Sequence, residues 1–356
     1  MKLKKIAACT ISLVLCIGSI SIVSGSEINT LMLDDAIEKA IKYSKTLKSY
    51  DEENKITNEE ISNTKLSLVS SGEPNQISSL AVQLKELYAK SEKNKLSASD
   101  EKEAIAFSVF SFFIDIINAE NNLKLYEEEL VLKEKNLKIS EVKLKYGKIS
   151  KNDYETELFE YNNLIKEKKE LQDIIDDAYT SLNKVLGTDL NTKYDLNLGE
   201  EITYNSIGEI NLETEITLAI NRNNEIKSQQ EEVDIAKYAL SLFTSGTGSD
   251  TKEAKIINYN KEFRSLEEQK TSLRESITKN YNEIIKLENE YNSNVTELEN
   301  MKKQLQIKEL NLKLGKATEI EIEEYKYEIK KLENTMQVQI YQHELLMRKF
   351  ENPALL

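Results

Sequence analysis

The chain has 356 residues, of which 39% are hydrophobic and 31% charged, with 10 glycines, 2 prolines and a formal net charge of −14. Globular chains average about 7% Gly and about 5% Pro, so this sequence is poor in both residues that break helices. Its acidic charge argues against nucleic acid and anionic lipid surfaces as partners. Both cysteines, Cys9 and Cys16, lie before Gly25, so the rest of the chain cannot form a disulfide or a thiolate metal site. We expect an elongated, acidic, all-α protein.

The first residues have the pattern of a secretory signal peptide. A basic "MKLKK" precedes an uncharged stretch, 6–23, and the small residues of "VSGS" follow it. An uncleaved membrane anchor is the alternative, because the uncharged stretch is close to the shortest spanning helix of about 17 residues. We expect a signal peptide over residues 1–25 and an exported protein of the cell envelope.

The remaining chain reads as two tandem halves, residues 26–186 and 212–356, with a linker over 187–211. Each half opens with an apolar face at helical spacing, from Leu33 and from Leu212. A short polar break follows in each half, over 67–76 and 241–250. We then expect a long helix, over about 77–145 and 251–313, and a returning helix, over about 151–186 and 319–349. The first long helix could be interrupted around Ser97, Ser99 and Asp100, and the linker could hold a short strand.

The long helices carry apolar residues spaced by seven, which is typical of helices that supercoil around neighbours. These residues are Val109, Ile116, Leu123, Leu130, Leu137 and Leu144, with the second-half counterparts Ile277, Ile284, Tyr291, Leu298, Leu305 and Leu312. A second stripe lies about 200° around the helix, at Leu125, Leu132, Ile139 and Tyr146, and in part at Ile307 and Leu314. A coiled-coil dimer needs one seam, whereas a helix within a curved layer needs one for each neighbour.

Each long helix is followed by a lone glycine, Gly147 in "KLKYGKISKNDYE" and Gly315 in "NLKLGKATEIEIE". Each residue of the first apolar stripe is separated from its second-half counterpart by the same number of residues as Gly147 is from Gly315. We call this number the repeat offset. A glycine in this position indicates a left-handed helix C-cap. Three residues later a capping box can start the returning helix. The two boxes are Ser150 with Asp153, and Thr318 with Glu321.

With these turns the chain resembles the TolC-like outer-membrane efflux and export family. The resemblance rests on the openings at Leu33 and Leu212, the two glycine turns, "SLNKVLG" at 181–187, and the tandem duplication. It implies a homotrimer whose helices form a hollow tunnel, and hairpin tips that dock an adaptor protein of a membrane pump. The implied docking residues are Tyr146, Gly147, Lys148, Ile149, Leu314, Gly315, Lys316 and Ala317.

The resemblance also implies acidic residues that line a pore constriction near the tips. Their counterparts here are Asp153, Glu321 and Glu324, although the first two are also placed to cap helices. The chain departs from the family where β-barrel strands are inserted. Its two polar breaks have ten residues each, too few for two membrane strands of about 9 to 11 residues and a turn. We therefore expect short polar loops there, and membrane association through the complex or an uncleaved leader.

No constellation of catalytic or cofactor-binding residues is found in the sequence. His343 is the only histidine, so a zinc site of the usual kind is excluded, and we expect it to be a packing or surface residue. Phosphate loops and nucleophile elbows are absent as well. The sequence predicts a non-enzymatic, cofactor-free channel-tunnel component of an efflux or type I export complex. The alternative is a coiled-coil structural or adhesive protein of the cell surface, without a pore.

Overall fold

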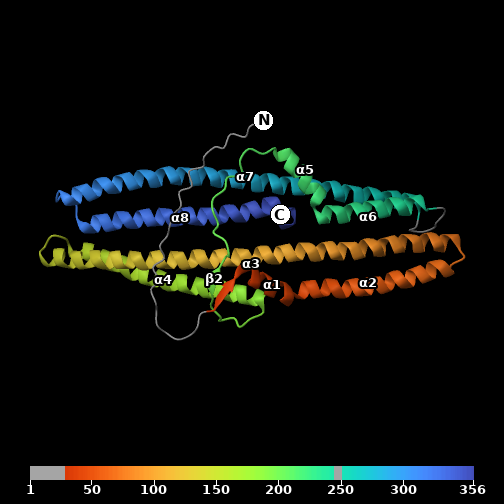
Figure 1. Cartoon of the computed structure of the whole chain (residues 1–356), viewed down its shortest axis with the longest axis horizontal. Coiled ribbons are helices and arrows are strands. Elements are labelled where there is room, and N and C mark those ends of the chain that lie inside the picture. The colour runs from red at the N-terminus through yellow and green to blue at the C-terminus, as the bar shows by residue number, and fades with distance from the viewer. Residues whose placement is uncertain (1–28, 244–250) are drawn as a thin grey trace.

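The computed structural model describes residues 29–243 and 251–356, and nearly all of this backbone is helical (Figure 1). The long helices are α2 (Lys45–Ser70), α3 (Pro74–Lys145), α4 (Lys151–Leu186), α6 (Asn224–Ser241), α7 (Lys252–Lys313) and α8 (Glu319–Glu351). Two shorter helices, α1 (Leu33–Tyr43) and α5 (Leu212–Arg222), open the halves. The strands β1 (Thr30–Met32) and β2 (Asp195–Asn197) pair in parallel, and a 3₁₀ turn, Pro353–Leu355, follows α8. The all-α prediction is confirmed, and a short strand does form in the linker.

The two halves are tandem antiparallel hairpins with matching bounds. Helix α3 ends at Lys145 and α7 at Lys313, and the returning helices begin at Lys151 and Glu319, so the repeat offset separates both pairs of bounds. With 72 and 62 residues, α3 and α7 are about 108 Å and about 93 Å long at ~1.5 Å per residue. The signal peptide expected over 1–25 and most of the second polar break lie outside the described residues.

The helices lie side by side in a single layer of four. Towards one end the order is α2, α3, α6 and α7, and towards the other end it is α4, α3, α8 and α7 (Figure 1). Helix α3 therefore runs through the middle, beside α6 and α8 of the second half. Helices α2 and α4 together form one long edge of the layer, and α7 forms the other.

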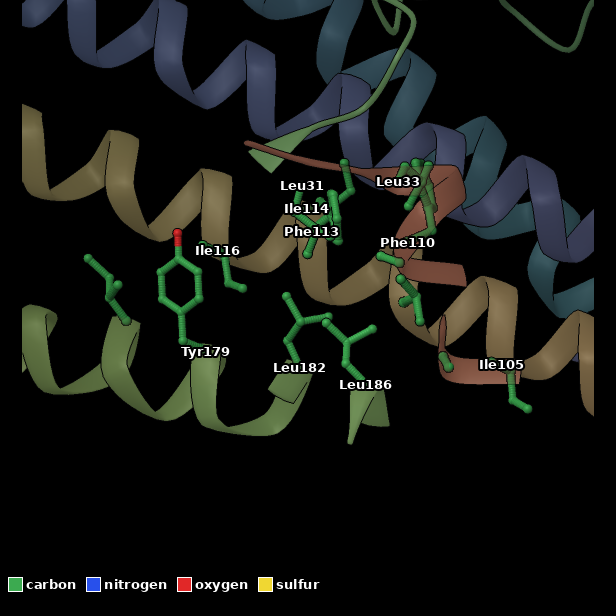
Figure 2. Packing of buried hydrophobic residues seen from close by; sticks show 14 residues of the cluster. Leu31, Leu33, Ile105, Phe110, Phe113, Ile114, Ile116, Tyr179, Leu182 and Leu186 are labelled. Carbon is green, nitrogen blue, oxygen red and sulfur yellow. The ribbon is translucent and has the colours of Figure 1, made fainter. Parts of the chain in front are cut away.

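The main core lies at the middle of the layer, where the opening of the first hairpin meets α3, α4 and the linker. Phe110 and Phe113 of α3 pack there against Leu182 of α4 and Leu31 of β1, and all four side chains are buried (Figure 2). A second cluster joins α5, α6 and α7, and a third joins α7 to α8. The apolar stripe at seven-residue spacing supplies residues to all three clusters, as its pattern predicts.

The structure differs from the expected helix bounds in three respects. Helix α3 is continuous through Ser97, Ser99 and Asp100, because packing on both sides of α3 outweighs the weak helix propensity of these residues. Each opening is divided into two helices, at Ser44 and at Asn223, whose side chains accept hydrogen bonds from backbone N–H groups of the following helix. The first polar break is reduced to three residues, 71–73, between α2 and α3.

Candidate functional site

The two glycine turns have the same geometry and end the long helices in left-handed C-caps. Gly147 has φ of 64° and Gly315 has φ of 69°. In each turn two backbone N–H groups return to the last helical carbonyls, from Gly147 to Leu144 at 2.9 Å and from Lys148 to Lys143 at 2.8 Å in the first. This 5→2 and 6→1 pattern is a Schellman motif. The second turn repeats it, with distances of 2.9 and 2.8 Å.

Both predicted capping boxes form directly after the turns. The Ser150 hydroxyl oxygen accepts from the Asp153 N–H at 3.1 Å, and an Asp153 carboxylate oxygen accepts from the Ser150 N–H at 3.1 Å. Thr318 and Glu321 repeat the arrangement at 3.4 and 2.8 Å. The hydrogen bond from the Thr318 backbone lowers the pKa of the Glu321 carboxyl. Asp153 and Glu321 therefore cap helices, while their carboxylates also remain exposed at the tips.

The tips carry an exposed surface of apolar and basic side chains. Tyr146 is 71% exposed and Leu314 is 60% exposed. Gly147, Lys148, Gly315 and Lys316 are exposed too, and Ile149 and Ala317 are half-buried. The eight residues predicted for docking therefore lie at the two tips, where six of them are exposed.

Glu324, the third acidic residue expected near the tips, has a partner on another helix. It is exposed, but its carboxylate accepts a hydrogen bond from Asn136 of α3 at 2.6 Å. This contact belongs to a polar seam that joins α3 to α8, and so the first half to the second. The seam contains Lys135–Glu323 at 2.7 Å, Asn136–Glu324, Tyr327–Glu129 at 2.8 Å, Lys330–Glu128 at 2.7 Å and Asn334–Asn122 at 2.8 Å. The seam was not expected from the sequence, because its partners lie in different halves of the chain.

The edges of the helical layer expose large apolar side chains. On α4, Phe159 is 65% exposed and Ile174 is 54% exposed. At the other edge, Ile307 on α7 and Leu314 just after it are each 60% exposed. The last two residues belong to the second apolar stripe found in the sequence, which lies opposite the buried one. Both edges of the layer therefore have the composition of surfaces that pack against further helices.

A buried polar cluster fastens the linker to the second hairpin. Glu288 of α7 accepts hydrogen bonds from the Ser206 hydroxyl at 3.0 Å and from the Ile207 N–H at 2.7 Å. Its carboxylate also lies 3.0 Å from His343 Nε2 on α8, and both side chains are buried. Tyr204 of the linker stacks on Tyr291, with ring centroids 4.2 Å apart. The only histidine is thus a buried packing residue with a carboxylate partner.

Neither a metal site nor a spanning helix is found in the described part of the chain. No group of three or more His, Cys, Asp or Glu side chains gathers there in a way that could hold a metal ion. Among the same residues, none of the helices combines the length and the apolar character needed to cross a membrane.

No protein-family model and no curated protein sequence matches the chain. Solved structures do match it over most of its length. The outer-membrane channel OprN shares 11% identity with a TM-score of 0.65, and the match covers 89% of each chain. CmeC, an outer-membrane channel of Campylobacter jejuni, shares 8% with a TM-score of 0.66, covering 91% of this chain and 85% of that one. The outer-membrane protein VceC of Vibrio cholerae shares 13% with a TM-score of 0.61, covering 88% and 94%.

Identities this low establish a shared fold, and the fold is shared along nearly the whole chain. The shared length includes the tandem hairpins, with α3 in the middle of the layer. The resemblance to TolC-like proteins is therefore confirmed at the level of architecture: this chain has the α-helical fold of solved bacterial outer-membrane channels.

Proposed function

We propose that copies of this chain form a closed trimeric ring around a water-filled bore, as the channel-tunnel component of an efflux or type I export complex. The observation that carries the proposal is the pair of apolar edges. A layer with two different apolar edges assembles head to tail, and such contacts either close into a ring or continue as a filament. Phe159 on one edge and Ile307 on the other are exposed members of these surfaces.

The hairpin tips are the surface that we propose for docking an adaptor protein. Each tip presents a bulky apolar side chain beside lysines, just beyond the end of a long helix. Such a surface fits the helical hairpin of a partner with apolar anchors and acidic flanks. The residues are Tyr146, Gly147, Lys148 and Ile149, with their counterparts Leu314, Gly315, Lys316 and Ala317.

The exposed carboxylates next to the turns supply the electrostatics of the bore's inner end. Asp153, Glu321 and Glu324 would form rings of acidic groups in the trimer. Rings of carboxylates favour cations in a pore. Transport through such a conduit is passive and involves no catalytic residue or cofactor. The proposed location of the protein is the cell envelope.

Two measurements test the ring. Light scattering on the purified protein should give three times the mass of one chain, which is 40.9 kDa with residues 1–25 retained, and negative-stain images should show hollow particles. A monomer at every concentration, or a solid rod without a central cavity, contradicts the proposal and favours a coiled-coil structural protein. Co-purification with an adaptor and a pump from the same envelope tests the docking role.

A further inference from the structure

The outer part of α4 is held on one side only, unlike the matching part of α8. Within 151–174 α4 has no buried residue, whereas 319–342 of α8 include Ile322, Tyr327, Ile329 and Met336, all buried. The cause is position, because α8 lies between α3 and α7, while α4 borders α3 at the edge of the layer (Figure 1). Phe159 and Tyr327 hold equivalent places, separated by the repeat offset, yet they are 65% and 8% exposed.

We propose that the outer part of α4 packs on α7 of a second copy, in the register that α8 has on α3 within the chain. This inference rests on the proposed ring and specifies its subunit contact. In the ring, α7 of one copy lies beside α4 of the next copy. This contact is equivalent to the contact of α3 with α8 within one chain. We add the repeat offset to the number of each α3 residue and subtract it from the number of each α8 residue. Each contact of the polar seam then becomes a contact between α7 of one subunit and α4 of the next.

The clearest converted contact is an ion pair. Glu323 of α8 and Lys135 of α3 lie 2.7 Å apart within the chain. The equivalent residues are Glu155 of α4 and Lys303 of α7, again a glutamate and a lysine in the same order. Both side chains are exposed in the single chain. This register requires opposite charges at the two converted positions, and Glu155 and Lys303 supply them.

A second converted contact is also complementary in charge. Asn334 and Asn122 bond to each other at 2.8 Å, and their equivalents are Lys166 and Glu290. Within the chain each of these two forms an exposed ion pair four residues away, with distances of 3.6 and 3.7 Å. Exposed ion pairs of this kind contribute little to stability, so Lys166 and Glu290 can exchange partners when a neighbouring subunit binds.

The remaining polar contacts convert into pairs that can still form hydrogen bonds. Asn136–Glu324 becomes Gln304 with Thr156, and Glu128–Lys330 becomes Thr296 with Asn162. None of the converted pairs places like charges together.

Phe159 supplies the apolar anchor of this contact. Its equivalent, Tyr327, lies against α3 and donates its hydroxyl to Glu129 at 2.8 Å. Conversion puts Phe159 beside Glu297 of the neighbour, where a shallow groove is lined by Thr296, Glu297, Met301 and other side chains of α7 and α8. Phe159 has no hydroxyl, so its role is to fill this groove and cover Met301.

Cysteine cross-linking tests the register directly. The variant Glu155→Cys, Lys303→Cys, with Cys9 and Cys16 replaced by alanine, should give a ladder of covalent dimer and trimer on oxidation. Either single variant should give none. The matched control, Lys135→Cys with Glu323→Cys, should link within one chain and give no ladder. A trimer by light scattering that yields no ladder from the test pair overturns the register and leaves the ring intact.

Charge exchange and truncation supply an independent readout of association. Glu155→Lys and Lys303→Glu should each weaken subunit association about two- to fivefold, as for an exposed ion pair, and the double exchange should restore it. Phe159→Ala should weaken it at least about tenfold, as for an anchor in a groove. The control is Val131→Ala on α3, in the middle of the layer, where the side chain is 53% exposed. Equal effects of Phe159→Ala and Val131→Ala overturn the inference, and a chain that never associates overturns the proposed ring as well.

Discussion

Replacing Glu288 by alanine should be the most destabilising single change outside the apolar cores. Its carboxylate is the shared acceptor for the Ser206 hydroxyl and the Ile207 N–H, and it is the partner of His343 Nε2. The residue is 8% exposed, so water cannot readily replace its carboxylate as the acceptor. A buried donor left without a partner costs about 1–3 kcal/mol, and Glu288→Ala removes the acceptor of two such donors, the Ser206 hydroxyl and the Ile207 N–H. We expect a loss of about 2–5 kcal/mol in the free energy of unfolding.

Guanidinium unfolding followed by helical circular dichroism measures this loss as a shift of the midpoint. The matched control is Glu290→Ala, on the same helix, whose side chain is 51% exposed in a pair with Lys286. That change should stay within about 0.5 kcal/mol of the parent. Hydrogen exchange should locate the effect of Glu288→Ala in the linker, at 203–208. Equal midpoints for the two variants would refute the argument that the buried carboxylate fastens the linker.

Three further predictions concern the tips and the core. Gly147→Ala and Gly315→Val should weaken adaptor co-purification with helicity unchanged, because an added Cβ meets no atom within 4 Å at either site and only the positive φ is penalised; unchanged co-purification of both variants would contradict this. The pKa of Glu321 is lowered from 4.5 by the Thr318 backbone, so its capping contribution is complete above the unfolded pKa and is lost as pH falls through the lower folded value. Backbone amides at the start of α8 should therefore be better protected from hydrogen exchange than in Glu321→Gln, and this difference should persist below pH 4.5. Loss of the difference at higher pH would argue against the capping role. Tyr179→Phe should cost about 1–2 kcal/mol by urea unfolding, since this buried hydroxyl lies 2.8 Å from the Tyr194 carbonyl oxygen; no change would show that the bond is dispensable.

The features predicted correctly from the sequence are those determined by local interactions. The seven-residue stripes indicated long helices, and Gly147 and Gly315 indicated left-handed caps, because each of these depends on residues within one or two turns. The capping boxes at Ser150 and Thr318 formed for the same reason. The tips and their carboxylates could therefore be located without a structure, although their roles in docking and in the pore stay predictions.

The features missed depend on contacts between distant segments. Asp100 reads as a helix breaker, yet α3 continues through it and its carboxylate accepts from Asn224 of α6 at 2.7 Å. His343 was expected in a packing or surface role, and nothing in the local pattern pointed to Glu288 on another helix. Glu324 gave no local sign of its partner Asn136 on the other hairpin. The repeat offset was the one long-range signal, and it becomes informative once a single seam is known.

The repeat offset also explains how the linker joins two hairpins into one body. Glu120 and Glu288 are equivalent positions on α3 and α7, and both lie beside the linker. The Tyr179 hydroxyl lies 2.9 Å from Glu120 and 2.8 Å from the carbonyl oxygen of Tyr194, near the start of the linker. Glu288 accepts from the Ile207 N–H, near its end. Glu288 thus contacts the end of the linker directly, whereas Glu120 is connected to its first part only through the Tyr179 hydroxyl. The proposed ring requires a subunit that presents its two edges at a fixed angle, and these contacts of the linker with both hairpins would supply that rigidity.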